Sequence, residues 1–152
     1  MTGNPRRPFR IVIVEDEALI AMDLEAMITD EGHTVIGEAA SLAEFQGLEF
    51  DKAPHLAFVD IQLAQNSSGF DVCRSIQLRW PDTAVVFLTA NPKMIPAVFY
   101  GAHGVIPKPF SQSGLLSAIR FIEEGISNPP PRLAEPPSFT PAPRVAAAWA
   151  PR

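Results

Sequence analysis

The sequence predicts an α/β fold, with a doubly wound, five-stranded parallel sheet and helices on both faces. Apolar runs of strand length alternate with segments of helical periodicity along residues 10–126, in the order of five strand–helix units. Residues 56–59 are Leu-Ala-Phe-Val without a polar interruption, which is typical of a central parallel strand covered on both faces. Residues 11–14 and 84–88 have the same apolar character and predict two further strands.

Five strands and five helices are expected in alternation. The strands are residues 11–14, 34–36, 56–60, 84–88 and 104–106, and the helices are residues 18–31, 41–50, 69–80, 93–100 and 113–124. Gly32 ends the first helix, and Ser41 with Glu44 forms a capping box at the start of the second. The fourth helix is expected to be weak, because Pro96 lies inside it and lacks the backbone N–H that a helix needs.

Composition divides the chain into an N-terminal extension (residues 1–9), a domain (residues 10–126) and a proline-rich tail (residues 127–152). Eight of the sixteen prolines lie in the tail, together with three consecutive alanines. Such a composition favours an extended or disordered, solvated segment. A docking peptide around residues 141–143 is the alternative, and Trp149 is expected either to anchor a contact or to be disordered.

Charge and cysteine content restrict the classes of function. Residues 10–126 contain seven basic and sixteen acidic residues, and this net charge of −9 argues against nucleic acid as a direct partner. No apolar run approaches the roughly 20 residues of a membrane span, and no signal peptide is expected. The single cysteine, Cys73, excludes an internal disulfide and fits a cytoplasmic location.

Polar residues stand at the ends of four expected strands. Because the carboxyl ends of parallel strands share one edge of the sheet, where ligands bind in open α/β folds, we expect these side chains to lie together. They are Glu15, Asp16 and Glu17 after the first strand, Asp60 at the end of the third, Thr89 after the fourth and Lys108 after the fifth. Each alone has an ordinary explanation as a helix start, a turn residue or a surface charge. Four matches in order indicate a shared site.

Several acids that converge repel one another, and a metal ion relieves this repulsion. Carboxylates a few ångströms apart raise one another's pKa, and burial increases the effect. Mg²⁺ suits such a site, because it is bound by few protein oxygens and keeps several waters. A lysine ammonium and a threonine hydroxyl can bind phosphoryl oxygens. We therefore interpret Asp60 as a nucleophile that accepts a phosphoryl group, with Thr89 and Lys108 beside it.

Residues 10 to about 125 resemble the receiver domain of response regulators. The resemblance rests on residues 11–17 (Ile-Val-Ile-Val-Glu-Asp-Glu), 59–63 (Val-Asp-Ile-Gln-Leu), 87–90 (Phe-Leu-Thr-Ala) and 108–110 (Lys-Pro-Phe). It implies a flavodoxin-like sheet with strand order 2-1-3-4-5. More narrowly, residues 15–24, 60–63 and 67–69 look like receivers of alphaproteobacterial stress-signalling regulators.

The resemblance implies a phosphoryl-transfer role. Asp60 would take the group from a phosphohistidine on a sensor histidine kinase or a phosphotransfer protein, and Thr89 and Lys108 would hold it. The peptide bond before Pro109 is often cis in this family. The output would be contact with a downstream protein, without direct binding of nucleic acid or membrane, and the chain would be no enzyme apart from its own phosphorylation and autodephosphorylation.

The resemblance also implies a set of metal ligands. The side chains of Asp16 and Asp60 and the backbone carbonyl of Gln62 would bind Mg²⁺. Glu15 would act through a metal-bound water.

Two features depart from the family pattern. Receivers usually carry Tyr or Phe three residues before the lysine as a rotamer switch, whereas this chain has Val105. Pro92 and Pro96 also weaken the helix that precedes it. We therefore expect activation to reorder the backbone of residues 91–103 instead.

Other functions are weighed against this one. A phosphate sink or shuttle would use the same chemistry. A metal-dependent phosphohydrolase often needs a second acid two residues after the nucleophile, where this chain has Gln62, which cannot protonate a leaving group. A flavodoxin-like cofactor site would need a glycine-rich phosphate loop in place of three acids, and the complete polar set disfavours a scaffold that is never phosphorylated.

The three histidines match no metal motif and are expected at the surface or in turns: His33, His55 and His103.

Overall fold

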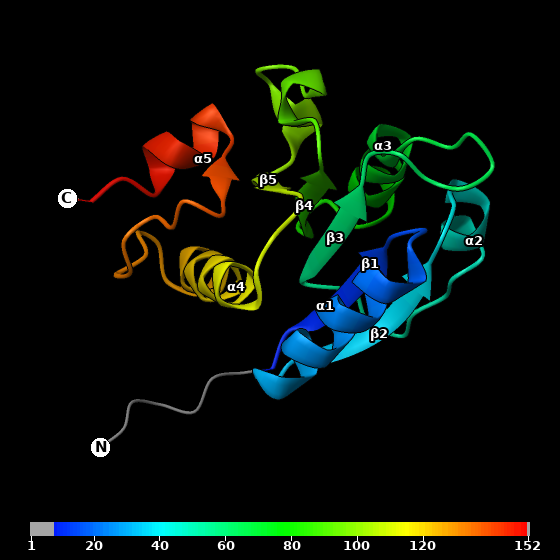
Figure 1. The fold of residues 1–152 in the computed structure, drawn as a ribbon, viewed down its shortest axis with the longest axis horizontal. Coiled ribbons are helices and arrows are strands. Elements are labelled where there is room, and N and C mark those ends of the chain that lie inside the picture. Colours follow the sequence, from blue (N-terminus) through cyan, green and yellow to red (C-terminus); the bar gives the residue numbers. More distant parts are fainter. Residues whose placement is uncertain (1–7, 152) are drawn as a thin grey trace.

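The computed structural model describes residues 8–151 as a six-stranded sheet with helices on both faces (Figure 1). The strands are β1 (Arg10–Val14), β2 (Thr34–Ala39), β3 (Leu56–Asp60), β4 (Ala84–Thr89), β5 (Gly104–Pro107) and β6 (Thr140–Pro141). Their order in the sheet is β2-β1-β3-β4-β5-β6. The first five strands are parallel, which confirms the predicted order 2-1-3-4-5, whereas the unexpected β6 pairs antiparallel with β5.

The helices form two layers because the strand residues alternate between two apolar clusters. Helices α1 (Ala18–Asp30), α4 (Gln112–Ser127) and α5 (Pro143–Ala148) pack with the cluster that contains Ile11 and Ile13. Helices α2 (Leu42–Gln46) and α3 (Gly69–Arg79) pack with the cluster that contains Val12 and Val14. Every residue of β3 is buried, as its unbroken apolar sequence predicts.

A variant of the predicted capping box is present at the start of α2, in which the Glu44 side chain bonds the backbone of Ala40 instead of that of Ser41. Ser41 Oγ accepts the backbone N–H of Glu44 at 3.1 Å, and Glu44 Oε1 accepts the backbone N–H of Ala40 at 2.9 Å. The helix nevertheless ends at Gln46, four residues earlier than expected, and Gly47 follows it. These caps fix where the chain turns after β2.

No regular α-helix forms over residues 93–100 of the described chain, in contrast to the expectation. Two 3₁₀ turns replace it, η1 (Pro92–Met94) and η2 (Phe99–Gly101). Pro96 cannot donate a helical hydrogen bond. In addition, Phe99 and Tyr100 have φ angles of 54° and 49°, in the left-handed region that a right-handed helix excludes.

The expectation of a disordered tail is wrong for residues 128–151, which pack on the domain. Phe139 and Trp149 are buried and join the cluster of α1 and α4. Thr140 pairs with Val105 of β5, and Pro141 is tolerated because β6 lies at the edge of the sheet. Burial of these apolar side chains offsets the cost of ordering the segment, which the proline content alone does not reveal.

The expectation of surface or turn histidines is wrong for His33, which is buried. Its Nδ1 accepts the backbone N–H of Phe9 at 3.0 Å, so the proton lies on Nε2, which faces Glu123 Oε2 at 3.3 Å. Phe9 is itself buried, with its ring centroid 5.2 Å from those of His33 and His55.

Of the expected N-terminal extension, residues 1–7 lie outside the described residues. Among the helices of residues 8–151, none is long and apolar enough to cross a membrane.

Candidate functional site

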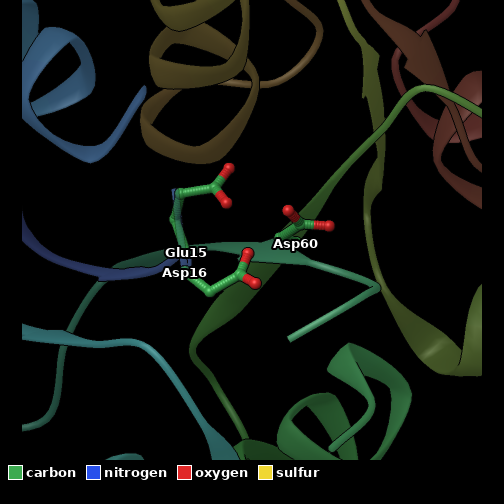
Figure 2. A group of neighbouring side chains, drawn as sticks. All are labelled: Glu15, Asp16 and Asp60. Atoms are coloured by element: carbon green, nitrogen blue, oxygen red, sulfur yellow. The ribbon is translucent and has the colours of Figure 1, made fainter. Parts of the chain in front are cut away.

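Three carboxylates meet at the carboxyl edge of the sheet (Figure 2). Glu15 and Asp16 follow β1 directly, and Asp60 ends the neighbouring strand β3. One oxygen from each lies within 4.8 Å of the others. Glu15 and Asp60 are buried, whereas Asp16 is exposed. The structure therefore brings together the three acids that the sequence places at these strand ends.

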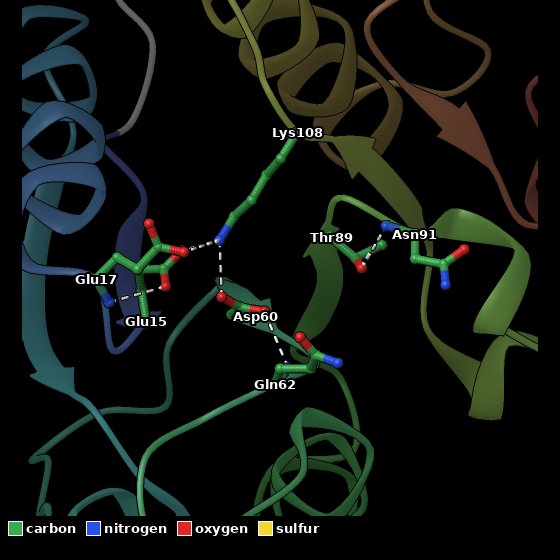
Figure 3. Close-up of polar contacts among 7 residues, drawn as sticks. All are labelled: Glu15, Glu17, Asp60, Gln62, Thr89, Asn91 and Lys108. Carbon is green, nitrogen blue, oxygen red and sulfur yellow. Dashed lines mark hydrogen bonds and ion pairs between the residues drawn. The ribbon is translucent and has the colours of Figure 1, made fainter.

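Lys108 enters the same space from the turn after β5 (Figure 3). Its Nζ donates to Asp60 Oδ2 at 2.7 Å and lies 2.7 Å from Glu15 Oε1. Glu17, which the sequence also places at this edge, has its Oε1 3.6 Å from the same nitrogen. Burial opposes the charged ammonium, but hydrogen bonds to Asp60 and Glu15 outweigh burial and raise the pKa of Lys108.

The site disfavours the ionised form of the Glu15 carboxyl group. Burial, followed by its contact with Asp60, raises the pKa of Glu15 to about 8. Its Oε2 accepts the backbone N–H of Glu17 at 3.1 Å, and its buried Oε1 has the Lys108 ammonium nitrogen at 2.7 Å. An additional cation would stabilise the ionised Glu15 carboxylate, and carboxylate oxygens are donors for a hard divalent ion. The acidic cluster could therefore hold a metal ion.

Asp60 is oriented from its other side by the loop that follows it. The backbone N–H of Gln62 donates to Asp60 Oδ1 at 2.9 Å (Figure 3). Gln62 thus lies beside the acid as the sequence expects, and the role of its carbonyl as a metal ligand stays a prediction. The packing role of Gly69 was not predicted from the sequence: a Cβ at this position would collide with the Asp60 carbonyl oxygen. A glycine at the start of a predicted helix was the available signal for this close approach.

Thr89 lies at the end of β4, next to β3 in the sheet. Its side chain is buried, and Oγ1 accepts the backbone N–H of Asn91 at 2.9 Å. The hydroxyl proton is therefore left to donate elsewhere. The carbonyl of Thr89 also accepts the backbone N–H of Lys108 at 2.8 Å, so the two predicted phosphoryl ligands are tied through their backbones.

The peptide bond between Lys108 and Pro109 is cis, as the resemblance implied. Val105, which replaces the usual aromatic residue, is buried in the cluster beneath α3. The Phe70 ring lies with its centroid 4.7 Å from that of Tyr100 and 5.3 Å from that of Phe87, which is the β4 residue that pairs with Val105.

Comparisons with known proteins agree with this geometry. The family profile described as "Response regulator receiver domain" matches residues 11–120. The chain is 45% identical over 84 residues to the phyllosphere-induced regulator PhyR of Methylorubrum extorquens, covering 55% of this chain and 31% of that protein. It is 34% identical over 116 residues to the transcriptional regulatory protein PdtaR of Mycobacterium tuberculosis, covering 75% of this chain and 56% of that protein. The chain thus spans between 31% and 56% of the length of these relatives.

Solved structures show the same likeness. The receiver domain of Erythrobacter litoralis PhyR superposes with a TM-score of 0.68 at 32% identity, covering 83% of this chain and 97% of that one. A mutant of the anti-anti-sigma factor PhyR from Bartonella quintana gives a TM-score of 0.64 at 33% identity, covering 80% of this chain and 49% of that one. With the carboxylates, the lysine and the strand order in place, the chain belongs to the family of response-regulator receiver domains.

Proposed function

We propose that this chain is a phosphoacceptor response regulator, in which Asp60 takes a phosphoryl group from a sensor histidine kinase or a phosphotransfer protein. The observation that carries the proposal is the position of Lys108 Nζ, 2.7 Å from both Asp60 Oδ2 and Glu15 Oε1. A structural ion pair needs one acid for each lysine. Here a third acid, Asp16, joins the cluster, and the excess of negative charge favours a divalent cation.

The transfer follows from the way Asp60 is held. One oxygen of Asp60 attacks phosphorus while the P–N bond to the donor histidine breaks, and its electrons return to the imidazole nitrogen. The Gln62 N–H holds Oδ1 and the Lys108 ammonium holds Oδ2, so the carboxylate is oriented before the donor arrives.

The residues proposed to hold Mg²⁺ are Asp16, Asp60 and the backbone carbonyl of Gln62, with Glu15 acting through water. When bound, the ion would supply positive charge against the oxygens of the phosphoryl group.

Two further groups would receive the oxygens of the transferred group. The Lys108 ammonium is a compact charge already within the site, and it needs only to exchange a carboxylate partner for a phosphoryl oxygen. The hydroxyl of Thr89 has its acceptor position occupied by Asn91 N–H, which leaves its proton for a second oxygen.

We propose that the phosphorylated protein acts in the cytoplasm through contact with a downstream protein, not as an enzyme on other molecules. The Bartonella quintana relative is described as an anti-anti-sigma factor, but this chain spans about half of it, so that activity is not carried over. A phosphate sink or shuttle is the second candidate, since it needs the same site. Gln62 lies where a phosphohydrolase would need an acid, and this disfavours hydrolysis of other substrates.

Intact mass spectrometry after incubation with acetyl phosphate and Mg²⁺ tests the proposal. The wild type should gain one phosphoryl group per chain, and Asp60→Asn should gain none. Asp82→Asn is the matched control, because Asp82 is exposed and precedes β4 at the opposite edge of the sheet. Full labelling of Asp60→Asn would overturn the assignment.

A further inference from the structure

The C-terminal residues 138–149, which we call the strap, run across β5 and α4 (Figure 1, orange to red). Thr140 and Pro141 extend the sheet beyond β5. At one end Ser138 Oγ donates to the carbonyl of Gly114 at 2.6 Å, and at the other Trp149 packs against Phe121 with a centroid distance of 5.7 Å. The strap is therefore attached along its whole length.

Two glycines of the domain leave the room that the strap occupies. A Cβ at Gly104 would lie 2.5 Å from the Thr140 carbonyl oxygen and 2.6 Å from the Phe139 ring. A Cβ at Gly125, in the last turn of α4, would lie 2.6 Å from the Trp149 indole. A solvated tail would require neither glycine, so the surface of the domain is shaped for the strap.

The strap also holds a strained turn. Phe99 and Tyr100 both adopt the left-handed conformation, which is costly for residues with a Cβ and persists only where the surroundings impose it. From α3, Gln77 Nε2 donates to the Tyr100 carbonyl at 2.6 Å. From the strap, the Arg144 guanidinium donates to the carbonyls of Gly101 at 3.0 Å and Ala102 at 3.3 Å. The turn is clamped between α3 and the strap.

This clamped turn belongs to the segment, residues 90–103, that connects the two phosphoryl ligands. The segment begins after Thr89 and leads into β5, whose Val105 pairs with the strap three residues before Lys108. When Thr89 and Lys108 bind the oxygens of a phosphoryl group, both ends of this segment are displaced, whereas the strap holds the segment in place. By linkage, an element that stabilises the unphosphorylated arrangement must be weakened by phosphorylation to the same extent.

We propose that the strap is an intramolecular regulatory element that opposes phosphorylation of Asp60 and is released when phosphorylation occurs. This inference rests on the proposed function. It makes the docked strap the resting state, and it makes the surface of β5 and α4 beneath the strap accessible in the phosphorylated protein.

The variant Gly125→Ala tests the inference in the full-length chain. The new methyl group evicts the Trp149 indole, while alanine favours the α4 helix itself. Gly47→Ala is the control, because the nearest atom to its Cβ lies at an ordinary 3.5 Å. Arg144→Gln is a second variant that removes the clamp without adding volume. A Trp80→Phe background makes Trp149 the only tryptophan in each protein.

Two measurements need no phosphoryl donor. In Gly125→Ala, Trp149 emission should shift to the red, and amide exchange at residues 99–103 should rise about fivefold or more, a coupling of ordinary size. Arg144→Gln should raise exchange at the same residues, and Gly47→Ala should change neither signal. Unchanged exchange at residues 99–103 in both strap variants would overturn the clamp.

The third measurement adds acetyl phosphate and Mg²⁺ and reads intact mass and Trp149 emission in the same sample. Wild type should expose Trp149 as phosphoryl groups accumulate, and Gly125→Ala should be phosphorylated several times faster. A fully phosphorylated wild type with unshifted Trp149 emission would overturn the strap inference and leave the proposed function standing. A wild type that gains no phosphoryl group would overturn both.

Discussion

The ammonium nitrogen of Lys108 lies 2.7 Å from Oδ2 of Asp60, although 48 positions separate the two residues in the chain. The parallel order β3-β4-β5 brings them together, because both follow the carboxyl ends of strands in one sheet. With Glu15 also 2.7 Å from the ammonium, Lys108 neutralises part of the charge of the acidic cluster.

Lys108→Met should destabilise the metal-free protein and slow its phosphorylation. The substitution leaves the acids at Glu15 and Asp60 without their ammonium, so the free energy of unfolding in chelator should fall by about 1–3 kcal/mol. Added Mg²⁺ should restore part of the loss, and phosphorylation by acetyl phosphate should slow by about tenfold or more. Urea unfolding with and without Mg²⁺ measures the first effect, with the exposed Lys93→Met as control. Equal stability of Lys108→Met and wild type in chelator would contradict this account.

Asp16→Asn should weaken Mg²⁺ binding while leaving the fold intact. Asp16 is the exposed member of the acidic cluster, so its substitution removes a ligand and leaves no buried group unpaired. We expect the Mg²⁺ dissociation constant to rise by about tenfold or more. Calorimetric titration against the Asp82→Asn control measures it, and an unaltered affinity would place the ion elsewhere.

Truncation after Ser127 should destabilise the domain. It exposes surface that Phe139 and Trp149 cover, and burial of an aromatic side chain contributes about 1.5–3 kcal/mol. After the entropy of ordering the segment is subtracted, we expect a net loss of about 2 kcal/mol in the free energy of unfolding. Urea denaturation measures this, with Leu133→Ala, an exposed residue of the same segment, as control. A truncated protein as stable as the wild type would show that the tail does not pack in solution.

The elements that can be predicted well from the sequence are those with a local pattern of apolar and polar residues. The strands around Asp60 are unbroken apolar runs, and the polar residues at their ends have to meet once the strands are parallel. Contacts between residues far apart in the chain leave no local pattern in the sequence, and the docking of the strap is the main example. Its prolines and alanines resemble a disordered segment, and the glycines that receive it, Gly104 and Gly125, have no distinctive context in the sequence.

Two smaller differences have the same origin. The left-handed turn at Phe99 and Tyr100 is imposed by contacts from α3 and the strap, because neither residue prefers that conformation by itself. His33 contacts Glu123, which lies 90 positions away in the chain, so the burial of His33 cannot be predicted from the residues next to it in the sequence.

Acidification should destabilise the protein partly through His103. Burial, with a smaller contribution from the Arg144 guanidinium, lowers the pKa of His103 to about 4. The unfolded chain, with an ordinary histidine pKa near 6.5, binds the proton first, so stability falls as the pH decreases from about 6.5 towards 4. His103→Gln should show a shallower decline of the urea midpoint over this range, because it lacks that proton uptake. Parallel declines in the two proteins would contradict the buried neutral state of His103.

Locating the phosphoryl group on the chain identifies its acceptor residue. Borohydride reduces an aspartyl phosphate to homoserine, so treatment of the phosphorylated protein followed by peptide mass spectrometry marks the acceptor permanently. We expect homoserine at position 60 alone, in an amount equal to the phosphoryl group measured on the intact protein, and none without Mg²⁺. Homoserine at Asp16 or at any other aspartate in place of Asp60, or a phosphoryl adduct that yields no homoserine, would contradict the assignment of Asp60 as the acceptor.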